Sequence, residues 1–197
     1  STVRTHAAAE AASGLTGSGP DDSFGPDRRI IHMGQVEYEL VDAADVDVHE
    51  LLEFYHRQQH CLNTSPEKLR SMLERSHCVV VARQDGRLVG IARGLTDGLR
   101  GYLTECKLDP ACQGPGAVTR TEGRIEHDEY GIARELATRV LACLREAGAE
   151  RIDVTAHGTE EDFCRDLGFR PVRGAVAMRM DPRMASLAEP VPAHAVR

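Results

Sequence analysis

Two apolar segments on either side of an Asp-Gly pair define a β-hairpin near the middle of this chain. The first segment, 78–83, begins with the continuous apolar run 78–82 that is typical of a buried strand, and Leu88, Gly90 and Ala92 continue as the returning strand. The intervening Asp85-Gly86 favours a tight turn, because both residue types tolerate a positive φ. The hairpin therefore predicts an antiparallel sheet around which the other segments must be arranged.

The remaining hydrophobic periodicities predict helices and further strands on both sides of this hairpin. Ser65 before Pro66 is a typical helix start, and Asp109-Pro110 ends a strand. The helices are expected over 48–59, 66–73, 131–148 and 159–167, and the strands over 36–40, 101–108, 151–156 and 172–180. This order of elements predicts the α/β class, as a mixed α+β sheet in which a meander precedes β-α-β-α-β and helices cover both faces.

Composition limits the compartment and the partners. We expect a flexible arm over 1–34, one domain over 35–182 and a loose tail over 183–197. The longest apolar run is far too short to span a membrane and no leader pattern is present, so a cytoplasmic protein with no membrane partner is predicted. A net charge of −7 without a basic stretch argues against nucleic acid. The six cysteines form no C-x-x-C pair and are predicted to be free thiols, and the sequence leaves a homodimer open.

Three segments in this order resemble the GNAT superfamily of N-acyltransferases across about Val36 to Asp181. They are 80–92 with its Asp-Gly hairpin, 102–114 with its Gln-Gly ending, and 163–172 with its Leu-Gly-Phe tripeptide. The resemblance implies transfer of an acyl group from acetyl-CoA, or a related coenzyme A thioester, to the amine of a small molecule. Alternatives on the same scaffold are a carrier-protein thioester as donor, a decarboxylation, or a module that binds CoA without chemistry.

The resemblance also implies where the donor binds. Its pyrophosphate is expected on a loop and helix start whose N–H groups favour negative charge. The pantetheine arm is expected beside the strand that precedes this loop, and a polar contact is expected from His157. The implied pyrophosphate residues are Gln113, Gly114, Gly116, Gly131, Ile132 and Ala133, and the implied pantetheine residues are Cys106, Lys107 and Leu108.

The loop departs from the family pattern through an insertion, Thr119 to Tyr130. Val118 stands where a small residue is expected, Pro115 has no N–H to donate, and the expected helix opening follows only at Gly131. The insertion is interpreted either as a solvated loop or helix extension, or as a lid with a basic inner side. Its carboxylates are expected to turn toward solvent or toward a cationic acceptor. We expect no metal site there, because no histidine or cysteine pair has ligand spacing.

Candidate catalytic residues come from the chemistry of amine acylation, which needs a base for the amine and an acid for the leaving thiolate. Strand alternation places Glu105 and Lys107 on one face, so Glu105 is either the general base or an outward-facing strand residue. Cys164 replaces the tyrosine of the family and is either the acid or a packing residue. Tyr102 and Tyr130 are possible substitutes for it.

The acceptor itself is not fixed by any motif. The segment between the two early helices forms the acceptor wall in the family, and here it holds Tyr55, His56, His60 and Cys61. The alternative interpretation is that this segment is a loop with two solvated histidines and has no role in binding the acceptor. The acyl chain and the amine therefore stay open.

Overall fold

The computed structural model describes residues 35–58, 64–114, 125, 127–158 and 160–180. The predicted arm 1–34, the tail 183–197, Gly116 and most of the insertion lie outside these ranges. The predicted domain limits therefore stay predictions.

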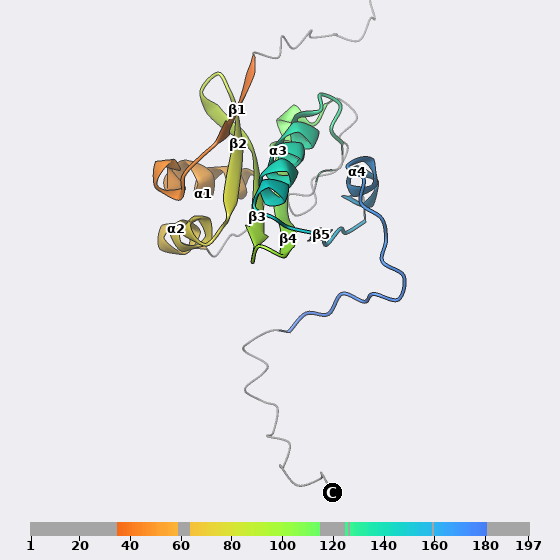
Figure 1. Ribbon diagram of the computed structural model, residues 1–197. Coiled ribbons are helices and arrows are strands. Elements are labelled where there is room, and N and C mark those ends of the chain that lie inside the picture. The colour runs from red at the N-terminus through yellow and green to blue at the C-terminus, as the bar shows by residue number, and fades with distance from the viewer. Residues whose placement is uncertain (1–34, 59–63, 115–124, 126, 159, 181–197) are drawn as a thin grey trace, which may run out of the picture. The chain divides into compact units, whose positions relative to one another are not determined.

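Five strands form one sheet in the order β1-β2-β3-β4-β5 (Figure 1). The first four pair antiparallel, and β5 runs parallel to β4. Asp85 (φ 51°) and Gly86 (φ 77°) make the turn between β2 and β3, which confirms the predicted hairpin. The strands are β1 Val36–Leu40, β2 Cys78–Gln84, β3 Arg87–Thr96, β4 Arg100–Leu108 and β5 Arg151–Val154.

Helices cover both faces of the sheet, as predicted (Figure 1). The pair α1 (Val48–Arg57) and α2 (Pro66–Glu74) lies on one side, and α3 (Ile132–Glu146) lies on the other. The short α4 (Glu160–Asp166) follows β5. The Ser65 hydroxyl accepts from the Lys68 N–H at 3.4 Å, so the predicted cap starts α2.

The alternation of β2 explains the two layers of the core. Cys78, Val80 and Ala82 pack in the cluster that contains the α3 side chains, whereas Val79 and Val81 pack in the cluster of α1 and α2. Successive side chains of a strand point to opposite faces, so a strand that is apolar throughout needs cover on both.

Two glycines on β3 let α3 approach the sheet closely. A Cβ on Gly90 would lie 2.7 Å from Leu136 Cδ1, and one on Gly94 would lie 2.9 Å from Val140 Cγ1. Larger residues would push α3 away from the sheet. The absence of side chains at these two glycines therefore sets the distance of α3 from the sheet, and the N-terminus of this helix borders the candidate site.

The strand predicted over 172–180 is wrong, although the mixed α/β class is confirmed. The segment has no strand pairing, and its side chains Val172, Val176, Met178 and Met180 are 68–92% exposed. An alternating pattern gives a strand only where a neighbouring strand takes up its hydrogen bonds and a layer covers its apolar face, and this segment has neither. Within the described ranges, no helix has both the length and the apolar character needed to cross a membrane.

Candidate active site

A β-bulge in β4 separates this strand from β5. Arg93 of β3 lies opposite Glu105 and Gly94 lies opposite Leu103, so Thr104 is one extra residue on β4. Pairing with β5 ends at the same point, where Leu103 faces Val154. A bulge bends its strand and increases the local twist. The second half of β4 after the bulge, 105–108, consequently pairs with β3 alone among the described strands.

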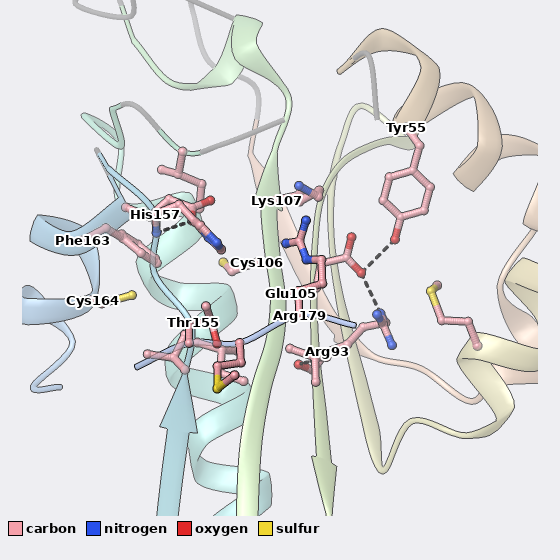
Figure 2. Close-up of a pocket in the computed structure, with 18 residues that line it drawn as sticks. Tyr55, Arg93, Glu105, Cys106, Lys107, Thr155, His157, Phe163, Cys164 and Arg179 are labelled. Atoms are coloured by element: carbon pink, nitrogen blue, oxygen red, sulfur yellow. Dashed lines mark hydrogen bonds and ion pairs between the residues drawn. The ribbon is translucent and has the colours of Figure 1, made fainter. Parts of the chain in front are cut away.

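A cavity of about 880 Å³ lies where the two strands part, and it is called the β4–β5 pocket here (Figure 2). One wall comes from β4 and α1, and the opposite wall comes from the end of β5 and from α4. The residues that carry the argument below are Tyr55, Arg93, Glu105, Cys106, His157 and Cys164, all of which line it.

On one wall, the Glu105 carboxylate is held by two donors from different elements (Figure 2). The Tyr55 hydroxyl donates to Glu105 Oε2 at 2.9 Å, and Arg93 Nε donates to the same oxygen at 2.6 Å. Arg93 also donates to Ser76 Oγ at 2.9 Å. The Glu105 and Arg93 side chains are only 7% and 12% exposed. The ion pair between them offsets the free-energy cost of burying two charges. Both bonds use Oε2, which leaves Oε1 outside them.

Two thiols and a histidine also line the pocket, with Cys106 on β4 and with His157 and Cys164 on the opposite wall. Cys106 Sγ donates to the Ala133 carbonyl at 3.5 Å and so ties β4 to α3. Burial raises the pKa of the Cys106 thiol well above its ordinary value, and burial with the nearby Glu160 raises that of Cys164 to about 11. Both thiols are therefore protonated at neutral pH. The half-exposed His157 lies with Nδ1 3.7 Å from a carboxylate oxygen of Glu160.

A second group of contacts surrounds the start of α3, and we call Gln113, Gly114 and residues 127–134 the α3 N-terminal site. Gln113 is buried, its Nε2 donates to the Leu108 carbonyl at 3.4 Å, and its Oε1 accepts from the His127 N–H at 3.2 Å. The Glu129 N–H donates to the Gln113 carbonyl at 3.0 Å. The end of the insertion is thus attached to the Gln-Gly segment.

The first turn of α3 is capped by Asp128. Its Oδ1 accepts from the Ala133 N–H at 3.1 Å and its Oδ2 accepts from the Arg134 N–H at 2.9 Å. The N-cap residue, Gly131 (φ 71°), has no side chain to do this, and unpaired first-turn donors attract the nearest acceptor. The expectation that the carboxylates of the insertion turn toward solvent or a cation is therefore wrong for Asp128.

Several solved structures with this arrangement of elements are named as acetyltransferases. A GNAT-family acetyltransferase from Streptococcus pneumoniae superposes with a TM-score of 0.57 at 18% identity, over 76% of this chain and 99% of that one. A putative acetyltransferase from Deinococcus radiodurans gives 0.55 at 22% identity, over 81% and 100%. An aminoglycoside N-acetyltransferase solved in complex with CoA gives 0.53 at 12% identity, over 74% and 95%. The chain has the GNAT fold.

The resemblance seen in the sequence is thus confirmed at the level of the fold. No protein-family model matches the sequence, and the comparison with curated proteins gives no match.

The GNAT fold brings the predicted site residues into two places. The β4–β5 pocket holds Glu105, Cys106, Lys107, His157 and Cys164, and Leu108 is buried in the core at the end of the same strand. The predicted pyrophosphate residues Gln113, Gly114, Gly131, Ile132 and Ala133 lie at the α3 N-terminal site, while Gly116 lies outside the described residues.

Other candidates are spread more widely. Tyr55 lines the pocket, but Tyr102 and Tyr130 do not, and these two are 41% and 42% exposed. His56 is exposed on α1. His60 and Cys61 lie outside the described residues, as do Arg120, Glu122, Arg124 and Glu126 of the insertion.

Sequence reasoning missed three residues of the site. Arg93 is a charged residue in the largely apolar strand β3. A charge in such a strand indicates a buried partner of opposite charge. Ile125, 3% exposed and lining the pocket, is the one aliphatic residue in a polar run. Asp128 gave a weaker signal, an acidic residue before a helix that starts with glycine. Among the described residues, no group of three or more His, Cys, Asp or Glu side chains could hold a metal ion.

Proposed function

We propose that this chain transfers an acyl group from a coenzyme A thioester to the amine of a small molecule. The observation that carries the proposal is the parting of β4 from β5 beside a buried carboxylate, which places a candidate base and a strand edge that pairs with no described strand in one cavity. The names of the structural neighbours support the same activity, and one of them was solved with CoA.

The donor would lie along the edge of β4 on the side away from β3. The amide groups of a pantetheine arm can pair with the backbone of Cys106, Lys107 and Leu108 as a short added strand. His157 on the facing wall would offer a polar contact. The pyrophosphate would lie at the α3 N-terminal site, where Gln113, Gly114, Gly131, Ile132 and Ala133 surround the helix start, and Gly116 stays a predicted contact outside the described residues. This arrangement would bring the thioester between Glu105 and Cys164.

Glu105 would act on the amine. The nitrogen attacks the thioester carbonyl, the new C–N bond forms as the C–S bond breaks, and the amine must lose a proton. Tyr55 and Arg93 fix Glu105 through Oε2, so Oε1 is the oxygen assigned to receive that proton, directly or through water. Two donors hold this base in position before the substrate binds. Less entropy is then lost in reaching the transition state, which increases the rate.

Cys164 is a poor acid for the leaving thiolate. Proton transfer from a thiol of pKa about 11 to a thiolate of ordinary pKa, roughly 8.5, is uphill by about 3 kcal/mol. Tyr130 does not line the pocket. An ammonium that becomes an amide loses two protons, one to Glu105 before the attack and one from the nitrogen after it. We assign this second proton, or one from water, to the thiolate, with Cys164 as an apolar part of the wall.

A module that binds CoA without chemistry is the second candidate, and the raised pKa of Cys164 is the observation that favours it. Release of free thiol from acetyl-CoA, followed in the presence of a panel of amino acids, amino sugars, polyamines and aminoglycosides, separates the two. An acyltransferase gives amine-dependent thiol release and an acylated amine by mass. Binding of CoA in calorimetry without thiol release for any amine would favour the binding module.

A further inference from the structure

The donors that would receive a pyrophosphate are already bonded to a carboxylate of the same chain. Asp128 accepts the N–H groups of Ala133 and Arg134, the second and third residues of α3, with one oxygen each. A backbone N–H makes one good hydrogen bond, so a phosphate oxygen and Asp128 cannot both take these two groups.

The other half of the same site is also filled by an acidic residue. A Cβ built on Gly114 (φ 108°) would lie 2.6 Å from Glu129 Cβ, so the Glu129 side chain is packed directly over this glycine. Close approach over a glycine of positive φ is what an anion-binding loop offers its ligand. Two adjacent carboxylates therefore occupy both parts of the α3 N-terminal site.

The contacts of the segment hold these carboxylates in place. The His127 and Glu129 N–H groups donate to the side chain and the carbonyl of Gln113, at 3.2 and 3.0 Å. The guanidinium of Arg134 is paired with Asp166 at 3.0 Å, so Asp128 is held by backbone groups rather than by this neighbouring cation.

From these contacts we infer that Asp128 is an internal competitor for the donor's phosphates and thereby sets donor specificity. A donor with a pyrophosphate binds only after Asp128 leaves the Ala133 and Arg134 amides. A phosphate-free pantetheine thioester makes no contact with these amides and needs only the proposed place along β4, so it binds without that displacement. The inference rests on the proposed acyl-donor site and makes Asp128 a specificity-determining residue within it.

A cap with no role in binding predicts a different result, because it would affect only the stability of α3. Two variants separate these roles. Asp128→Asn removes the charge and keeps an oxygen for the cap, and Asp128→Ser keeps a good capping residue with a shorter side chain. Asp162→Asn, at an exposed position of α4, removes the same charge from the surface and is the matched control.

The experiment is isothermal titration calorimetry of the full chain and these variants with CoA and with acetyl-pantetheine, after each variant is checked for a cooperative thermal transition. We expect both Asp128 variants to bind CoA about tenfold more tightly than the parent chain, because a negative charge at a helix N-terminus is removed. The affinity for acetyl-pantetheine should stay within about twofold, as should both affinities of Asp162→Asn.

Equal CoA affinity in the parent chain and both Asp128 variants, with acetyl-pantetheine bound by all, would overturn the inference and leave the proposed function standing. A parallel gain for both ligands would also overturn it, since the phosphate-free ligand does not compete for the amides. Failure of every protein to bind either ligand would overturn the donor site itself, and the inference with it.

Discussion

The β4–β5 pocket and the α3 N-terminal site meet the same requirement, the pairing of buried polar groups, in opposite ways. In the pocket, Tyr55 and Arg93 share one oxygen of Glu105, and the neighbouring edge of β4 has no strand partner among the described residues. At the α3 start, the amides are paired with Asp128. Under the proposed function, the pocket is arranged for its ligand in advance, whereas the helix start would have to exchange Asp128 for a phosphate.

The difference teaches where binding free energy can be gained or lost. Groups fixed before a ligand arrives add to its affinity and to the rate of its reaction. Groups that must first give up an internal partner subtract from affinity by the free energy of that contact. Chemistry and donor affinity are therefore expected to respond to different substitutions in this chain.

The largest expected effect comes from Glu105→Gln, which tests whether the pocket is preorganised for catalysis. The amide oxygen can still accept from Tyr55 and Arg93, but it cannot take up a proton. Turnover should fall by roughly 10² to 10⁴, the range typical of a lost general base, while CoA affinity persists. Glu39→Gln, exposed on β1, is the control. If turnover is unchanged across the pH range, Glu105 is not the general base and another residue must be.

Next in size is the loss of stability on Arg93→Met, which leaves Glu105 buried without its cation. We expect the free energy of unfolding to fall by about 3 kcal/mol in denaturant titrations. The exposed pair Arg134–Asp166 gives the contrast, because Arg134→Met should cost less than about 1 kcal/mol. Much of the Arg93→Met loss should return when Glu105→Leu is added. If Arg93→Met and Arg134→Met lost equal stability, the Arg93–Glu105 pair would be no more desolvated than the exposed Arg134–Asp166 pair.

A smaller effect is predicted at the α3 start, where Asp128→Ala removes the cap. Thermal and denaturant unfolding should show a loss of about 1 kcal/mol, with Asp128→Ser closer to the parent chain. This loss of stability has the opposite sign to the expected gain in CoA affinity. If Asp128→Ala left stability unchanged, the carboxylate would contribute nothing to the helix, and the comparison with the pocket would fail.

The smallest effect concerns alkaline pH and Cys164. Its folded pKa of about 11 lies above the ordinary thiol value of 9.0, so the folded state keeps the proton to higher pH than the unfolded chain does. The associated stability is fully present below about pH 9 and is lost as pH rises toward 11. Cys164→Ala lacks this contribution and should lose less stability between pH 9 and 11, with parallel behaviour from pH 6 to 8. Identical declines would indicate that the thiol is not desolvated.

Most of the fold could be predicted because its signals are local. The Asp85-Gly86 turn, the Ser65 cap and the placement of α3 between Gly131 and Gly148 each depend on residues that touch one another along the chain. The segment 172–180 failed for the converse reason. Its alternation is as regular as that of β1, but a strand needs a partner that its own sequence does not specify.

The site was only partly predictable, for a similar reason. Alternation correctly separates Glu105, which reaches α1 through Tyr55, from Cys106, which reaches α3 through the Ala133 carbonyl. The bulge at Thr104 carries no glycine or other local signal. Asp128 bonds an amide five positions ahead of it, a spacing set by how the insertion returns to the helix.

The Thr104 bulge also has a consequence for how such a site can change during evolution. A bulge is one residue of chain length, so point substitutions cannot remove it, whereas a single-codon deletion can. Deleting Thr104 would make Leu103 and Glu105 consecutive in a regular strand, so Glu105 would still face α1, but the bend at the point where pairing with β5 ends would be removed. Substitutions can therefore alter the walls of the pocket one at a time, but the bend that parts β4 from β5 depends on chain length, and a descendant of this chain keeps or loses it in one step.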